Sequence, residues 1–116
     1  MQATLKQLLN ETLRVVIIES FSADTFSLTV SVDHHNIKVC DEGNMPYLRS
    51  SIQAVMRDLS LHDIGEIFIH QKQGLPFLKI PDYFLPTDFG NGVIHLTPTA
   101  LQSHSDTSRF IRSLNP

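Results

Sequence analysis

The stretch Arg49–His70 constrains the fold most, because it specifies a helix followed at once by a strand. Ser50 is a good helix N-cap, and Gln53 follows it at the spacing of a capping box. Steps of three, one and three residues then place four apolar side chains on one helical face: Ile52, Val55, Met56 and Leu59. The segment Glu66–His70 carries three consecutive β-preferring apolar residues, which indicates a strand covered on both faces. A helix joined directly to a buried strand needs a sheet on which to pack.

The chain before this stretch predicts that sheet. Leu13–Glu19 is rich in β-branched residues, as strands are. Phe26–Val32 alternates apolar and polar residues with the two-residue period of a half-buried strand. A third predicted strand, Ile37–Cys40, follows a short polar turn, and such short links favour an antiparallel meander. The remaining segment, Gln2–Glu11, has a narrow leucine stripe that predicts a short helix.

These elements predict an α+β fold. The expected architecture is a two-layer sandwich, in which an antiparallel sheet of a three-strand meander plus a fourth strand is covered on one face by helices. A C-terminal helix is predicted to begin at Thr97–Pro98 and to run toward Leu114, with threonine as N-cap and proline in the first turn. The 116 residues suit a single α+β domain spanning residues 1–116.

Residues 72–91 depart from these patterns. Prolines at positions 76, 81 and 86 forbid a helix and restrict any strand to a sheet edge. The segment is nevertheless too apolar for a solvated linker, so we predict an extended stretch lying across the domain, with a short strand at Gly92–Leu96 after it. Its large side chains form a candidate partner surface: Leu75, Phe77, Tyr83, Phe84 and Phe89. The alternative is that the segment covers the core and buries its own aromatic rings.

Composition bears on localisation and on partners. The 12 acidic residues outnumber the 9 basic ones, and the basic residues form no run, which argues against nucleic-acid binding. Cys40 is the only cysteine, so no internal disulfide is possible and a reducing cytoplasm is the expected location. The first twenty residues lack the ordered parts of a signal peptide. No apolar run approaches the ~20 residues of a membrane span, so no membrane association is expected.

Several histidines are candidate ligands. His70 ends a predicted strand and His95 lies in another; if these strands are neighbours, both imidazoles could meet Asp82 or Asp88 in a pocket. Such a cluster would be a metal site or a small active site. The alternative is a pair of partly buried histidines that hydrogen-bond to the backbone, which is the commoner arrangement.

Two further groups carry less chemistry. His34 and His35 are adjacent, and adjacent strand residues point to opposite faces, so the two cannot easily share one ion. A polar turn explains them equally well. Cys40 has no local catalytic signature, and a lone cysteine at a strand end is usually a packing residue.

One part of the chain, about residues 36–71, resembles a family of small uncharacterised bacterial cytoplasmic proteins. Four residues fall in the order of a family turn of the type D-x-x-G-x-P-L-x-x-x-S: Asp41, Pro46, Leu48 and Ser50. Ile69–Gln71 resembles the end of the family's strand near V-H-Q. The chain departs from the pattern at Lys72–Gly74, where the family has an acidic tail. The resemblance implies a bacterial cytoplasmic protein and no particular activity.

No motif in the sequence identifies an activity, a cofactor or a catalytic residue. We therefore expect a small non-catalytic binding or assembly module that acts through protein–protein contacts, either with another protein or with itself as a homodimer. The sequence leans against an enzyme without deciding the matter. The alternative remains a metal-binding protein or small enzyme that uses the cluster His70, His95, Asp82 and Asp88.

Overall fold

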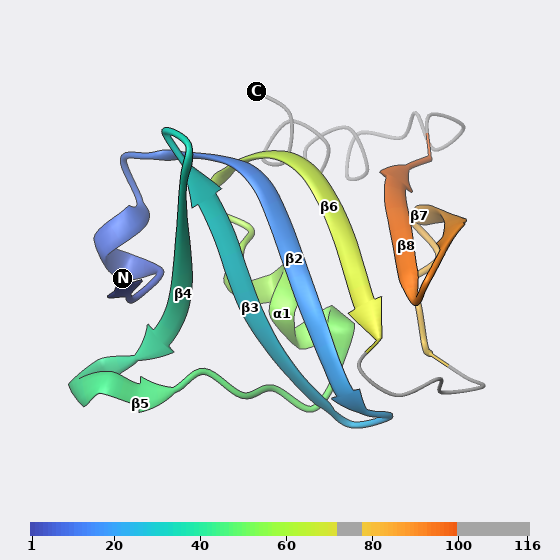
Figure 1. Cartoon of the computed structure of the whole chain (residues 1–116), viewed down its shortest axis with the longest axis horizontal. Helices are drawn as coiled ribbons and strands as arrows, with labels where there is room; N and C mark the ends of the chain where they lie inside the picture. Colours follow the sequence, from blue (N-terminus) through green and yellow to red (C-terminus); the bar gives the residue numbers. More distant parts are fainter. Residues whose placement is uncertain (72–77, 100–116) are drawn as a thin grey trace.

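The structure, a computed structural model, describes residues 1–71 and 78–99 (Figure 1). Among these residues, eight strands form one mixed sheet: β1 (Gln2–Ala3), β2 (Thr12–Ser22), β3 (Thr25–Val32), β4 (His35–Asp41), β5 (Met45–Pro46), β6 (Asp63–Gln71), β7 (Phe84–Gly90) and β8 (Val93–Pro98). There is one α-helix, α1 (Ile52–Asp58), and two 3₁₀ turns, η1 (Lys6–Leu8) and η2 (Glu42–Asn44). The strand order is β1-β4-β3-β2-β6-β8-β7, and β5 pairs with β4.

The predicted α+β sandwich is wrong, because strands dominate the molecule. They hold 57% of the described residues, against 14% in helical turns, and a single helix covers the sheet. The predicted meander is present as β2, β3 and β4, which pair in antiparallel fashion. The fourth strand, β6, instead runs parallel to β2, because the chain crosses the core face through α1 before β6 begins. The sheet is therefore mixed rather than antiparallel.

The predicted helix at Gln2–Glu11 is wrong, and so is the predicted start of the C-terminal helix at Thr97–Pro98. Residues 2–11 form β1 and η1, because the polar side chains of Thr4 and Gln7 each accept a hydrogen bond from the other's backbone N–H and so close a single turn. The leucine stripe is also incomplete, since Leu9 is 44% exposed. At the other end, Thr97 and Pro98 belong to β8 and pair with β7. The rest of the predicted C-terminal helix lies outside the described residues.

The hairpins follow the sequence closely. β3 and β4 are joined by Asp33 and His34, and β7 and β8 by Asn91 and Gly92. All four of these residues have positive φ, from +49° to +78°, the backbone that two-residue hairpin turns require. The predicted strand at residues 92–96 is thereby confirmed as β8. The proline-rich segment contributes β7, an edge strand with Pro86 inside it, while residues 72–77 lie outside the described part of the chain.

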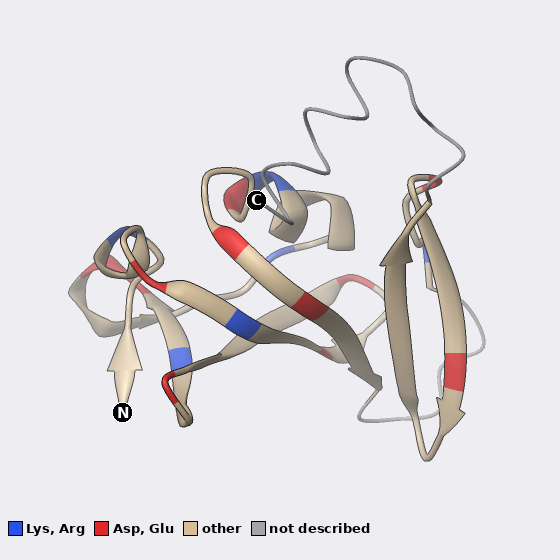
Figure 2. Cartoon of the chain, turned by 90° about the horizontal axis from the view of Figure 1, so that it is seen from above, with Lys and Arg blue, Asp and Glu red and all other residues tan. Residues whose placement is uncertain are grey.

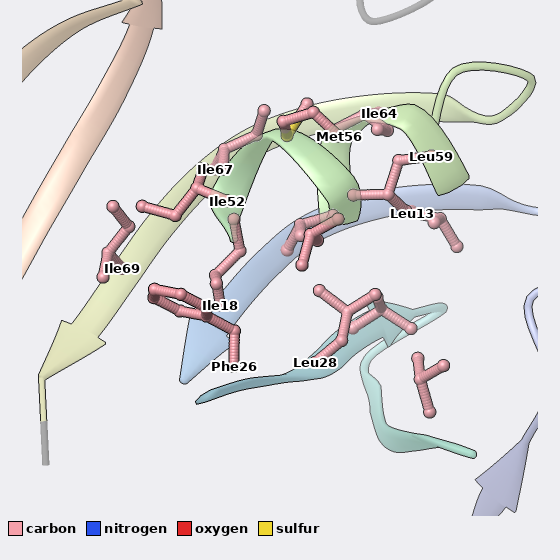
Figure 3. Packing of buried hydrophobic residues seen from close by; sticks show 14 of the residues in the cluster. Leu13, Ile18, Phe26, Leu28, Ile52, Met56, Leu59, Ile64, Ile67 and Ile69 are labelled. Carbon is pink, nitrogen blue, oxygen red and sulfur yellow. The ribbon is translucent and has the colours of Figure 1, made fainter. Parts of the chain in front are cut away.

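Helix α1 covers one face of the sheet, which we call the core face (Figure 3). Its N-cap is Ser51 rather than the predicted Ser50: the Ser51 hydroxyl accepts a hydrogen bond from the Ala54 N–H at 3.0 Å. The four predicted apolar residues of the helix are all buried: Ile52, Val55, Met56 and Leu59. They pack with side chains from three strands, among them Ile18, Leu28 and Ile67. The predicted burial of β6 on both faces is only half correct, because Phe68 is partly exposed on the other side.

In the parallel strands β2 and β6, the alternation of core-facing side chains is interrupted at the same level of the sheet. Leu13 and Val16 on β2 are both buried in the core although three residues apart, and Ile64 and Ile67 repeat that spacing on β6. A regular strand would place residues three apart on opposite faces, so both strands deviate at the same level. Gly65 makes this possible: a Cβ there would lie 2.3 Å from the Arg14 carbonyl oxygen.

Viewed from above, the hairpin β7–β8 stands at one end of the sheet, beyond β6 (Figure 2). The lysines and arginines are dispersed over several described elements (Figure 2). No helix in residues 1–71 and 78–99 is long and apolar enough to cross a membrane.

The open face of the sheet as a candidate binding site

The face away from α1, which we call the open face, is organised as two rows of side chains that cross the strands. In the first row, Ile17 of β2 pairs with Phe68 of β6, and Phe68 pairs with His95 of β8. In the second row, Glu19 pairs with His70, and His70 with Val93. Residues two apart share a face of a strand, so the rows lie side by side. The sequence produces this face by alternating these residues with the core residues of the same strands.

Three rings form an aromatic cluster at the hairpin end of the open face. The His95 ring lies 4.8 Å from the Phe68 ring and 5.6 Å from the Phe89 ring, measured between centroids. Phe68 and Phe89 meet edge to face at 6.1 Å. Phe89 sits at a bulge between Asp88 and Gly90 and has no partner in the strand ladder. Its ring is anchored by the cluster, yet the residue remains 58% exposed.

Each histidine of the open face has a glutamate beside it. His70 Nδ1 lies 4.0 Å from Glu19 Oε1, and His95 Nε2 lies 3.6 Å from Glu66 Oε1. The two glutamates differ in environment, since the Glu19 side chain is 17% exposed and that of Glu66 is 64% exposed. The structure therefore brings the two predicted histidines to one face, on neighbouring strands, but with partners that sequence reasoning did not identify.

The aspartates proposed for the same cluster lie elsewhere. Asp88 pairs with Ile94, a position that faces away from His95, and its Oδ1 accepts a hydrogen bond from the Gly90 N–H at 2.8 Å. Asp82 precedes β7 and lines a separate hollow with Ser51 and Gln53. Within the described residues, no group of three or more His, Cys, Asp or Glu side chains could hold a metal ion.

The residues of the predicted aromatic partner surface lie in different environments in the structure. Phe84 is buried, Tyr83 is half-buried, and Phe89 is exposed. Leu75 and Phe77 lie outside the described residues. Leu85, which is 59% exposed on the same strand as Phe89, lies in the predicted segment but was not among the residues named for the surface. The signal was the two-residue spacing of Leu85, Thr87 and Phe89 along one face of a strand, but Pro86 within this run and Pro81 before it obscured the strand.

A hollow of about 260 Å³ opens on the open face between β2, β3, β6 and β8. Its described lining contains three apolar side chains, one carboxylate, one imidazole and one hydroxyl: Ile17, Phe68, Val93, Glu19, His70 and Thr29. The two rows of the sheet thus meet in one concave site with an apolar floor and a polar end.

A second hollow, of about 300 Å³, lies near η1 and the end of α1 and contains a connected polar network. Asp58 Oδ2 accepts hydrogen bonds from the Tyr47 hydroxyl and from Arg49 Nε, both at 2.7 Å. Arg49 also makes two 3.0 Å bonds to Asp41, and its guanidinium lies 4.0 Å from the Tyr47 ring centroid. Burial, reinforced by the bond to Asp58, raises the pKa of Tyr47 well above its ordinary value. Because Arg49 occupies both carboxylates, we interpret this network as a structural clasp between β4 and α1.

The other chemical candidates have structural explanations. Cys40 is buried at 6% exposure in the wall of the second hollow. His62, which sequence reasoning did not single out, is also buried, and its Nε2 lies 2.8 Å from the Leu5 carbonyl oxygen, tying η1 to the turn after α1. His34 and His35 are exposed at the β3–β4 turn.

The chain matches no protein-family model, no curated protein and no solved structure. The resemblance of residues 36–71 to a bacterial family therefore stays a prediction, and the function has to be argued from the site alone.

Proposed function

We propose that this protein is a non-catalytic assembly module that binds a second copy of itself through the hairpin end of its open face. One observation carries the proposal. Leu85 and Phe89, which are 59% and 58% exposed, lie on the same edge strand at a spacing of four residues. Large apolar side chains grouped on an exposed surface are typical of interaction sites.

The spacing suits a two-fold contact. Four residues of a strand span about 13 Å, with Thr87 midway between the two apolar side chains. In a two-fold dimer the same patch meets itself. If two β7 strands pack antiparallel with Thr87 on the axis, Leu85 of each copy lies against Phe89 of the other. The aromatic cluster supports Phe89 from behind, which lowers the entropic cost of fixing its ring in an interface.

Association through the side chains of the open face is favoured over the addition of a partner's strand to the outer edge of β7. Pro86 has no N–H to offer an added strand. The Phe84 N–H already donates to the Pro81 carbonyl oxygen at 3.1 Å. The outer edge of β7 is therefore poor in donors, as guarded edge strands are, and the side chains of the open face are left as the more favourable means of association.

Light scattering coupled to size-exclusion chromatography tests the proposal across a range of concentrations. The expected molar mass is twice the 13.1 kDa of one chain. Phe89→Glu places a charge in the contact and should give a monomer. Leu61→Glu is the matched control, because Leu61 is 80% exposed but lines the second hollow; it should remain dimeric. A wild-type protein that is monomeric at every concentration, or a Phe89→Glu variant that still dimerises, would overturn the proposal.

A further inference from the structure

The 260 Å³ hollow on the open face has the chemistry of a small-molecule site. We propose that it binds a small organic cation, a primary amine or amidine carried on an apolar arm. The hollow lies over β2, β3, β6 and β8, whereas the proposed dimer contact runs along β7. The two proposals are therefore independent, and each can fail without the other.

The floor of the hollow is apolar and drawn from three strands. Ile17 and Phe68 face each other across β2 and β6, and Val93 extends the floor on β8 beside His70. Phe68 is held from the other side by the His95 ring at 4.8 Å. An alkyl or phenyl group seated there would lose water contact at a gain of roughly 25 cal/mol per Å² of apolar surface. The floor thus accounts for the apolar arm of the ligand.

The polar end of the hollow selects positive charge. Glu19 contributes a carboxylate whose side chain is only 17% exposed, and partial burial strengthens its attraction for a cation. A carboxylate has two oxygens with about four lone-pair sites, so Glu19 can accept a ligand N–H in addition to its present contacts. Thr29 adds a hydroxyl beside the carboxylate. An anionic ligand seated on the same floor would instead be repelled by the Glu19 carboxylate.

The dimensions point to a free small molecule rather than to a large one. Ligand pockets for drug-sized molecules start at about 300 Å³, and this hollow is slightly smaller at about 260 Å³. A phenylalkylamine matches both the size and the arrangement, with its ring on the floor and its ammonium group at Glu19. A lysine side chain of a partner protein carries the same chemistry, so the experiment must separate the two sources.

The test is an NMR titration of the full chain with 4-phenylbutylamine, following backbone amide shifts. Saturable shifts are expected at Phe68, His70 and Val93. The acid 4-phenylbutyrate has the same arm with the opposite charge and should bind at least about tenfold more weakly. The tripeptide Gly-Lys-Gly, with blocked ends, should produce smaller shifts than the amine. Equal affinity for amine and acid, absence of saturable shifts, or tighter binding of the tripeptide would overturn the proposal.

Two variants test whether the Glu19 carboxylate is the group that binds the ammonium group of the ligand. Glu19→Gln keeps the shape of the side chain and should weaken amine binding by about tenfold or more. Glu66→Gln is the matched control, because Glu66 also lies beside a histidine of the open face but does not line the hollow; it should bind as the wild type does. Equal losses in both variants would contradict the site.

Two further variants test whether the amine binds on the floor of the hollow and whether its binding is independent of self-association. Val93→Phe should abolish binding by filling the floor, and its amide spectrum shows whether the fold is intact. Repeating the titration on Leu85→Glu, which places a charge in the proposed dimer contact but lies outside the aromatic cluster that packs on Phe68, separates amine binding from self-association. The expected affinity is unchanged there, and loss of binding in that variant would overturn the independent site.

Discussion

Neighbouring residues of β2 show how differently the two faces of this sheet are used. Ile18 points to the core face and is fully buried beneath α1. Ile17, one residue earlier, lies on the open face and is half-buried in the floor of the hollow. The two residues share a type, a strand and nearly the same backbone. Only the alternation of the strand separates a side chain that stabilises the fold from one that shapes a site.

The same contrast applies to polar groups. On the α1 side, the Asp58 side chain is 33% exposed and accepts hydrogen bonds from the Tyr47 hydroxyl and from Arg49 Nε, both at 2.7 Å. On the open face, Glu66 stands 3.6 Å from His95 and is mostly in water. Tyr47 is only 2% exposed, and its hydroxyl must be paired, because leaving a buried polar group unsatisfied costs free energy. An exposed carboxylate such as that of Glu66 is hydrated by water and does not need a protein partner.

The largest expected difference between the faces is at this isoleucine pair. Ile18→Ala should lower the free energy of unfolding by about 2–5 kcal/mol, because it removes buried methylenes and leaves a cavity. Ile17→Ala should cost about 1 kcal/mol or less, since water already reaches that side chain. Urea unfolding followed by circular dichroism measures both. Comparable losses in the two variants would mean that the open face is covered as fully as the core face.

The second expected effect is at Gly65, where both parallel strands change face. An added methyl group would lie 2.3 Å from the Arg14 carbonyl oxygen, a backbone atom that cannot swing aside. Gly65→Ala should therefore cost about 2 kcal/mol or more in unfolding free energy. Gly43→Ala is the comparison: it meets no atom within 4 Å, and its φ of +72° should cost about 1 kcal/mol. A milder effect at Gly65 than at Gly43 would contradict the close approach of β2 and β6.

Local patterns in the sequence were sufficient for β2, β3, β4, β6 and β8 and for the buried face of α1, but not for β1, β5 or β7. Phe26–Val32 alternates with a period of two, and Ile52 begins a period of 3.6, and the structure follows both. The parallel pairing of β2 with β6 had no such signal, because strand direction is set by how the chain crosses the core and not by residue type. The predicted helix at Gln2–Glu11 shows a related limit. Its short stripe of leucines stabilises a helix only weakly, and hydrogen bonds accepted by the side chains of Thr4 and Gln7 close a single turn there instead.

The candidate site was predictable only in part. His70 and His95 could be placed on two strands, yet their contacts with Glu19 and Glu66 join residues that are 51 and 29 positions apart in the sequence. Local sequence does not contain that information. Phe84 illustrates the opposite error: it belongs to the apolar segment expected at a partner surface, but the alternation of β7 turns it into the core.

The third prediction tests the hydrogen bond of the buried Tyr47 hydroxyl to Asp58. Tyr47→Phe removes one hydrogen bond while Arg49 still donates to Asp58, so the loss in unfolding free energy should be about 1 kcal/mol at neutral pH. Burial and then Asp58 raise the pKa of Tyr47 above its ordinary 10.0. The folded state therefore favours the protonated phenol, and this stabilising contribution is complete below pH 10 and declines as the pH rises beyond it.

Urea unfolding from pH 8 to pH 11 provides the measurement for Tyr47→Phe. The wild type should lose stability more steeply above pH 10 than the variant. Burial also raises the pKa of Tyr83, so a smaller decline should persist in both proteins. Identical pH profiles would show that the Tyr47 phenol is not enclosed as described.

The smallest effect is expected at the exposed pair on the open face. The ion pair between Glu66 and His95 exists only when the imidazole is protonated, and the Glu66 side chain is 64% exposed. Exposed ion pairs contribute about 0–1 kcal/mol and are screened by salt. Glu66→Gln should therefore change the unfolding free energy by less than about 0.5 kcal/mol at pH 6 and at pH 8, and high salt should remove what difference there is. A larger loss of unfolding free energy that salt does not remove would mean that Glu66 is buried. The open face would then not be accessible to water at the edge of the proposed site, and its contrast with the buried core face would fail there.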